Sequence, residues 1–332
     1  MQTGRAYGKL ILAGEHAVVY GVPAIAVGIV RGSRAVARPA SPARADSDAR
    51  PASNVNELRI AAWSVDVREG GDGDLARAFT ALLASARSRN AFSPMQVDAS
   101  TALPAGGGLG CSAALGVAVA RAISPDGSDE DVLADAMAWE KVFHGNPSGV
   151  DAAVATRGGA IQFVRGAGIE SLESGSLVFA IGHSGNASST KTMVEGLARL
   201  REAEPAMVGA AFERIRTIAR DARGAIESGD LAALGDAMAD NQEILAKLAL
   251  STPDIDAMCA VARNRGALGC KLTGAGGGGC VVALAEDRAS AERVVEAWRE
   301  NRKDGFVTEL GAPHHEKNSR GLAPAKDSVT AI

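Results

Sequence analysis

Two glycine-rich segments constrain the fold most: "PAGGGLG" at residues 104–110 and "TGAGGGG" at residues 273–279. Glycine loses more backbone entropy on folding than any other residue, so a cluster indicates an unusual turn or a close backbone approach. The first segment runs into a helix of small residues and the second lies between two apolar strands, which argues against flexible linkers. Backbone N–H groups at a helix N-terminus bind phosphate because the helix dipole adds positive potential there. The first segment therefore predicts a phosphate-binding loop.

Neither common nucleotide fingerprint is present in the chain. The dinucleotide pattern GxGxxG fails because Cys111 stands at its third glycine position. The nearest match to a P-loop, "GNASSTKT", has Thr190 in place of the glycine before Lys191. Threonine tolerates poorly the backbone shape that this glycine supplies, so the pattern disfavours a P-loop.

The length and the order of elements predict two α+β domains. At 332 residues the chain is too long for most single cores. We expect strands at 9–14, 22–30, 57–67, 92–101, 158–164, 176–183 and 305–310, and a strand, glycine loop and strand over 270–286. We expect helices at 74–88, after Cys111, at 128–145, over most of 204–250, and at 251–266 and 290–303. A Pro- and Ser-rich loop is expected at 37–54. The expected domains are 1–170 and 171–311, with a loose tail at 312–332.

Charge and cysteine content exclude several classes of function. A net charge of −4 without a basic cluster argues against nucleic-acid binding. The four cysteines form no CxxC pair, so neither a zinc site nor a disulfide framework is indicated. The N-terminal segment has no apolar stretch long enough for a signal peptide or a membrane span. We therefore expect a cytoplasmic protein that binds neither membranes nor nucleic acid.

The segment "WEKVFHGNPSGVD", residues 139–151, places two acids near the end of a capped helix. Glu140 lies in its last turns with His144 one turn later, and Asp151 follows a turn. An ordinary helix C-terminus followed by a loop acid would also give this pattern. Beside a phosphate loop, however, one acid on Mg²⁺ and one at a substrate hydroxyl are the parts of a phosphoryl-transfer site.

A third segment, "GKLILAGEHAVVYG", surrounds an N-terminal strand with Lys9, Glu15 and His16. Alone, these residues would be typical of a solvated strand end and a polar turn. Together with "PAGGGLGCSAA" and "KLTGAGGGGC", the segment resembles the three signature motifs of the GHMP kinases, in order, from Lys9 to Cys280. The wording of "GEHAVVYG" and "FHGNPSGVD" is similar to the branch of this family that phosphorylates mevalonate.

The resemblance implies a fold, a reaction and a set of site residues. The implied fold is the two-domain GHMP-kinase fold: an N-terminal mixed α/β domain with a left-handed βαβ-type nucleotide site, and a C-terminal ferredoxin-like α+β domain. The implied reaction transfers the γ-phosphate of ATP to the C5 hydroxyl of mevalonate, in a homodimer. The implied roles are Asp151 and Lys9 in catalysis; Ser112 and Glu140 on Mg²⁺; Thr101, Pro104, Ala105, Gly106, Gly107, Gly108, Leu109, Gly110, Cys111 and Ser112 at the nucleotide; and Lys9, Glu15, His16, Ser148, Asp151, Thr190, Thr273, Gly274 and Ala275 at the substrate.

Two residues depart from the family pattern. Tyr7 replaces a proline in the first motif, and Cys111 replaces a serine in the second. We expect Cys111 to contribute its backbone N–H, and its thiol, near a helix N-terminus, to be open to alkylation or oxidation.

Other activities of the same fold stay open from the sequence: a phosphomevalonate kinase, another small-alcohol kinase, a decarboxylase, or a non-catalytic ligand sensor. A phosphorylated substrate would require more basic residues than Lys9 and Lys191 in the motif segments. A sensor would be expected to lose Asp151, Lys9 or a magnesium ligand, and all are present.

Overall fold

The computed structural model describes residues 1–40, 55–186 and 189–313. Most of the predicted Pro- and Ser-rich loop and of the predicted tail therefore lies outside the described residues. The loop does not begin at residue 37 as expected, because residues 37–39 complete a strand of 16 residues, β2 (Ala24–Pro39). Both neighbours of this strand extend as far, so its end is paired: Ala37 lies opposite Gln2 on one side and Val97 on the other.

The N-terminal unit is built on a sheet that has seven strands in the described part of the chain, in the order β4-β3-β5-β2-β6-β7, with β1 (Gln2–Ala13) also pairing with β2. The remaining strands are β3 (Glu57–Ile60), β4 (Val65–Arg68), β5 (Met95–Thr101), β6 (Ala160–Val164) and β7 (Gly168–Leu172). A strand was expected over 57–67, but a 3-10 turn, η2 (Ala61–Trp63), divides it into β3 and β4, which pair as an antiparallel hairpin. β3 and β5 pair in parallel with helix α1 (Asp74–Arg87) in their connection. The left-handedness of this β3–α1–β5 connection stays a prediction.

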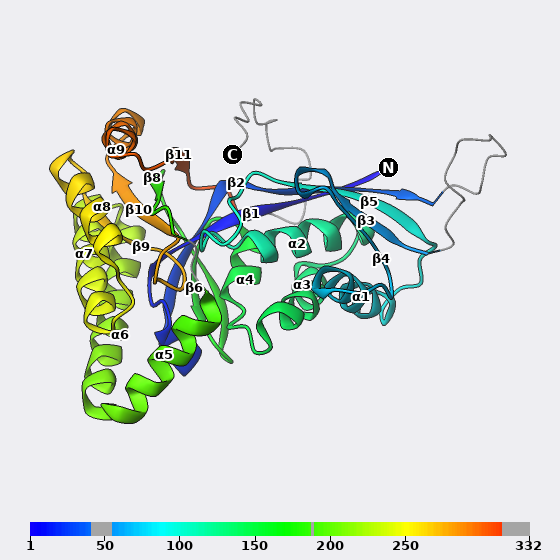
Figure 1. The fold of residues 1–332 in the computed structure, drawn as a ribbon, viewed down its shortest axis with the longest axis horizontal. Coiled ribbons are helices and arrows are strands. Elements are labelled where there is room, and N and C mark those ends of the chain that lie inside the picture. The colour runs from blue at the N-terminus through cyan, green and yellow to red at the C-terminus, as the bar shows by residue number, and fades with distance from the viewer. Residues whose placement is uncertain (41–54, 187–188, 314–332) are drawn as a thin grey trace.

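Three further helices join α1 beneath this sheet: α2 (Cys111–Ile123), α3 (Asp129–His144) and α4 (Val150–Arg157) (Figure 1). Helix α2 is buried along most of its length, which its small residues permit. A Cβ on Gly116, for example, would lie 3.0 Å from the ring of Trp139 on α3. The predicted start of α3 is confirmed, because Ser128 and Asp131 form a reciprocal capping box. Helix α4 was not predicted.

The C-terminal unit has the predicted ferredoxin-like arrangement. Its sheet, four-stranded in the described residues, has the order β11-β8-β10-β9, antiparallel throughout. The strands are β8 (Val178–His183), β9 (Gly269–Leu272), β10 (Cys280–Ala285) and β11 (Gly305–Glu309). The helices are α5 (Thr190–Ala203), α6 (Pro205–Ser228), α7 (Leu231–Lys247), α8 (Pro253–Asn264) and α9 (Arg288–Glu300). This βαββαβ order with the outer strands last and second is the split βαβ pattern.

The two units meet along β1 and β2, which run from one end of the molecule toward the C-terminal helices (Figure 1). Strand β7 pairs with β6 in the N-terminal sheet, so a division at residue 170 would cut it. We therefore propose the division after Leu172. Within the described residues, no helix is both long enough and apolar enough to cross a bilayer.

Candidate active site

The centre of the site is an ion pair between a buried lysine and a half-exposed aspartate. Lys9 lies within β1 and its side chain is 2% exposed, whereas Asp151 lies in the first turn of α4 and is 38% exposed. The Lys9 Nζ and the Asp151 Oδ1 are 3.0 Å apart. Lys9 Nζ also donates to the Gly108 carbonyl at 3.1 Å, and Lys9 N donates to the Leu109 carbonyl at 2.9 Å. The lysine is thus held by the first glycine loop and presented to the aspartate.

The first glycine loop needs glycine for two distinct reasons. Gly106, Gly108 and Gly110 have φ of 70°, 77° and 72°, a region that residues with a Cβ adopt only with strain. Gly110 is also the N-cap of α2, and a Cβ there would lie 3.3 Å from the Cβ of Lys9. The loop therefore turns sharply into the helix and leaves space for the Lys9–Asp151 pair beneath it.

The second glycine loop packs directly on the first, backbone against backbone. A Cβ on Gly108 would lie 2.5 Å from the Thr273 carbonyl oxygen, and a Cβ on Gly274 would lie 2.8 Å from the Gly108 Cα. Cys280 N donates to the Gly107 carbonyl at 3.1 Å. The two glycine segments of the sequence therefore contact each other, and this contact joins the N-terminal unit to the C-terminal unit.

An oxygen cluster lies at the start of α2. Ser112 Oγ donates to Glu140 Oε1 at 2.5 Å, and Trp139 Nε1 donates to Ser112 Oγ at 3.2 Å. His144 Nε2 lies 3.6 Å from the second carboxylate oxygen of Glu140. The pKa of Glu140 is raised to about 7, mainly by burial and also by the nearby Asp151 charge, while the hydrogen bond from Ser112 and the charge of Lys9 oppose the shift.

This cluster fits a magnesium ion. A buried carboxylate with a raised pKa is stabilised in its ionised form by a nearby cation, and hydroxyl and carboxylate oxygens are ligands that Mg²⁺ accepts. The described residues contain no group of three or more His, Cys, Asp and Glu able to hold a metal. A Mg²⁺ ion bound with a nucleotide is generally held by one or two protein carboxylates together with the substrate phosphates.

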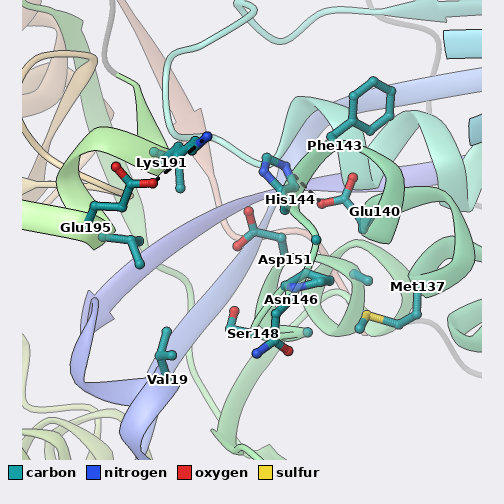
Figure 2. A pocket seen from close by; sticks show the side chains of 16 residues that line it. Val19, Met137, Glu140, Phe143, His144, Asn146, Ser148, Asp151, Lys191 and Glu195 are labelled. Atoms are coloured by element: carbon teal, nitrogen blue, oxygen red, sulfur yellow. Dashed lines mark ion pairs between the residues drawn. The ribbon is translucent and has the colours of Figure 1, made fainter. Parts of the chain in front are cut away.

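A cavity of about 560 Å³ opens beside Asp151 of the Lys9–Asp151 pair (Figure 2). Figure 2 shows Asp151 between Glu140, His144 and Phe143 on one side and Lys191 with Glu195 on the other. The remaining lining comes from the turn before α4, from α3, from α5 and from Val19: Val19, Met137, Gly145, Asn146, Pro147, Ser148, Gly149, Ala152, Thr190 and Val194. A second hollow of about 70 Å³ lies between the glycine loops, lined by Gly106, Gly108, Thr190, Thr273, Ala275, Gly276, Gly278 and Gly279.

Eight of the twenty predicted site residues line these two hollows. Asp151, Glu140, Ser148 and Thr190 line the larger one, and Thr190 also lines the smaller one. In the second glycine loop, the Thr273 hydroxyl accepts from Ile11 N at 3.3 Å. Of the first glycine loop, Gly106 and Gly108 line the smaller hollow, and Gly107 and Leu109 are buried. Pro104 is half-buried and Ala105 is exposed.

Glu15 and His16 are buried and line neither hollow. The Glu15 carboxylate is ion-paired with Lys271 and accepts from Asn241 Nδ2 at 2.9 Å. His16 Nε2 lies 2.7 Å from the Ala275 carbonyl oxygen, and burial lowers the pKa of His16. These two residues therefore fix the turn after β1 to the second glycine loop.

Cys111 and Thr101 support the first loop from the core side. The Cys111 side chain is buried in the core, with its Sγ 3.7 Å from Thr101 Oγ1. Burial raises the pKa of the Cys111 thiol, so the expectation of an activated, accessible thiol is wrong. Thr101 Oγ1 also accepts from Ser33 Oγ at 3.0 Å and from Leu103 N at 3.2 Å.

Sequence reasoning missed three residues that act on the site through others. Trp139 holds Ser112, while Lys271 and Asn241 hold Glu15. Lys271 belongs to the segment "KLTGAGGGGC", so its place in a motif was a usable signal. No local pattern marks Asn241, whose partner lies 226 positions away in the chain.

Family models match both units of the chain. The model described as GHMP kinases N terminal domain matches residues 75–159, and the model described as GHMP kinases C terminal matches residues 222–304. The first match contains the first glycine loop with Glu140 and Asp151, and the second contains Lys271 and the second glycine loop.

Full-length relatives and solved structures agree with the family models. The mevalonate kinase of Aeropyrum pernix is 32% identical over 313 residues, which cover 91% of this chain and 94% of that protein. The mevalonate kinase of Pyrococcus horikoshii is 31% identical over 300 residues, covering 84% of this chain and 87% of that protein. The crystal structure of L. major mevalonate kinase in complex with R-mevalonate is 26% identical, with a TM-score of 0.77 over 93% of this chain and 96% of that chain. With both family models in the order of the motifs and relatives matched over nearly their whole length, the chain belongs to the GHMP kinases.

Proposed function

We propose that this chain transfers the γ-phosphate of ATP to the C5 hydroxyl of mevalonate, giving 5-phosphomevalonate and ADP. The observation that carries the proposal is the Lys9–Asp151 pair, 3.0 Å apart, beneath a glycine loop that opens a helix and beside a cavity of about 560 Å³. That volume lies within the ~300–1,000 Å³ usual for small-molecule sites. The relatives named mevalonate kinase support the choice of acceptor.

The cavity suits an acceptor with one carboxylate and an apolar branch. Lys191 is the one permanent cation among the described residues that line it, and its Nζ lies 3.9 Å from Glu195 Oε1. Met137, Phe143, Val19 and Val194 supply apolar surface. A carboxylate drawn to Lys191 would leave the far hydroxyl of mevalonate toward Asp151, across the cavity.

The chemistry asked of the protein is mostly positioning and charge stabilisation. A primary alcohol is a weak nucleophile, and phosphoryl transfer spreads charge over the equatorial oxygens. Asp151 holds the hydroxyl and takes its proton, while Lys9 stabilises the oxygen on which charge develops. The first glycine loop and the N-terminus of α2 direct backbone dipoles at the phosphates.

Ser112 and Glu140 would hold Mg²⁺. When bound, the ion supplies charge neutralisation to the nucleotide phosphates. In its absence Glu140 keeps a proton more readily, because burial raises the pKa of its carboxyl to about 7.

The alternatives fit the cavity less well. A phosphorylated acceptor would bring further negative charge to a lining with one lysine and three acids, Glu140, Asp151 and Glu195. A ligand sensor would not require the Lys9–Asp151 pair to be held against the phosphate loop. A homodimer and a cytoplasmic location are further proposals, based on the family resemblance alone.

The test is a panel of acceptors with Mg-ATP, followed by ADP release and phosphorus NMR of the product. The panel contains mevalonate, 5-phosphomevalonate, homoserine and galactose. We expect turnover with mevalonate and a phosphomonoester coupled to the C5 methylene protons. A product phosphorylated at C3, release of CO₂, or preference for the phosphorylated acceptor would reject the assignment.

A further inference from the structure

A buried charge cluster joins the C-terminal sheet to the catalytic strand. Lys271, on β9, is fully buried, yet its Nζ has three acceptors. It is ion-paired with Glu15, and it donates to the Leu272 carbonyl at 2.6 Å and to the Ile11 carbonyl at 3.3 Å. An ammonium group needs three acceptors to be satisfied in a core, so this lysine is fully paired.

The carboxylate of Glu15, the partner of Lys271, also has both of its oxygens paired. Glu15 follows β1, and its side chain has no exposed surface. One of its oxygens faces Lys271 and the other accepts from Asn241 on α7 at 2.9 Å. Because both oxygens are taken inside the core, Glu15 has no group directed at the cavity.

This cluster holds β1 at a point two residues from the catalytic lysine. Both backbone groups of Ile11 bond to the β9 segment: Ile11 N donates to Thr273 Oγ1 at 3.3 Å, and the Ile11 carbonyl accepts from Lys271. The pairing of β1 with β2 is irregular between Ile11 and Ala13, so the ladder alone does not fix the strand there. Lys9 and Ile11 share a strand face, because side chains alternate along a strand.

A buried ion pair contributes little stability compared with an apolar pair of the same size, whereas it penalises every arrangement that separates the charges. The cluster is therefore suited to fixing geometry. We propose that Glu15 and Lys271 are positioning residues, which together hold β1 so that Lys9 stays between the first glycine loop and Asp151. This proposal rests on the proposed phosphoryl transfer. In it, Glu15 belongs to the buried cluster and does not contact the acceptor substrate.

The test compares Glu15→Gln, Lys271→Met and the double variant in steady-state assays with mevalonate and ATP. Each single change should lower kcat at least ~10-fold, because displacement of a reacting group by a fraction of an ångström is costly in rate. KM for mevalonate should stay within ~3-fold, since no group that contacts it is removed. The double variant should lose no more than the worse single variant, because the two residues act as one unit.

Lys303→Met is the matched control. Lys303 is also ion-paired, with Asp254 at 2.7 Å, and also donates to a carbonyl, that of Ser184 at 2.5 Å. None of these three residues lines the cavity or the smaller hollow. We expect a change in melting temperature without a change in kcat. Circular dichroism at the assay temperature verifies that each variant is folded. Asn241→Leu, which removes the second donor to Glu15, should lower kcat in the same manner and serves if Lys271→Met does not fold.

Two results would overturn the proposal. One is a folded Lys271→Met or Asn241→Leu enzyme with wild-type kcat. The other is a Glu15→Gln enzyme that loses affinity for mevalonate alone, which would make Glu15 a substrate ligand. Failure of wild-type protein to phosphorylate mevalonate rejects the proposed function instead, and the same comparison is then made with the acceptor found in the panel.

Discussion

Adding one methyl group at Gly108 should separate the two glycine loops. The Cβ of Gly108→Ala would lie 2.5 Å from the Thr273 carbonyl oxygen and 3.3 Å from the Gly274 Cα. Both obstacles are backbone atoms, so no side-chain rotation relieves them. Gly108 also accepts the hydrogen bond from Lys9 Nζ, so a shift of this residue moves a partner of the catalytic lysine.

The cost has two parts. A non-glycine residue at a φ of 77° costs about 1–2 kcal/mol in any context. Ordinary contact between carbon and its neighbours begins near 3.4 Å, so the loops must also separate by roughly 1 Å, a misplacement that costs about 10²-fold in rate. We therefore expect Gly108→Ala to have a lower free energy of unfolding and a kcat reduced about 10²-fold.

The variant Gly229→Ala distinguishes the cost of backbone strain from the cost of displacing the loops. Gly229 ends α6 with a φ of 73°, and nothing lies within 4 Å of its added Cβ. The free energy of unfolding of Gly229→Ala should fall by about 1–2 kcal/mol, the cost of placing any alanine in the left-handed region. Its kcat should be unchanged. Urea unfolding measures the first quantity and coupled ADP release the second. Equal kcat values for the two variants would refute the contact between the loops.

Three other outcomes are expected. Ser112→Ala and Glu140→Gln should each raise the Mg²⁺ concentration for half-maximal rate, and unchanged metal titrations in both would reject their role. Lys191→Met should raise KM for mevalonate about 10-fold, the loss of one charge-assisted hydrogen bond, with kcat little changed; an unaltered KM would remove Lys191 from the acceptor site. Burial lowers the pKa of His16 below its ordinary 6.5, so its neutral form stabilises the fold above that pH, and this contribution is lost as pH falls below 6.5. The free energy of unfolding of the wild type should therefore fall more steeply below pH 6.5 than that of His16→Gln, which keeps a donor for Ala275; parallel curves would contradict this assignment.

Locally encoded elements could be predicted from the sequence. Ser128 and Gly145 bound α3 because a cap and a stop act through neighbouring residues. Helix α4 was missed because its eight residues, VDAAVATR, carry no apolar periodicity, and burial against the rest of the fold forms it. Strand β7 was likewise missed, since it exists through its pairing with β6.

The site residues also divide into those that local sequence predicts and those that depend on distant contacts. Motif residues that touch phosphate loops or the cavity, such as Asp151, Glu140 and Thr190, were found from their segments. The environment of Glu15 could not be found, because its partner Lys271 lies 256 positions away. The burial of the Cys111 thiol also depends on packing that no local pattern contains.

In the proposed reaction Asp151, held by Lys9, takes the proton of the hydroxyl during phosphorylation of mevalonate. The most direct measurement is rapid-quench single-turnover kinetics of Asp151→Asn, together with ATP affinity. We expect the rate of phosphoryl transfer to fall about 10³-fold, within the range for a lost general base. ATP should bind within ~3-fold of wild type, since the first glycine loop, Ser112 and Glu140 are unchanged. Single-turnover rates near those of the wild type would contradict the account.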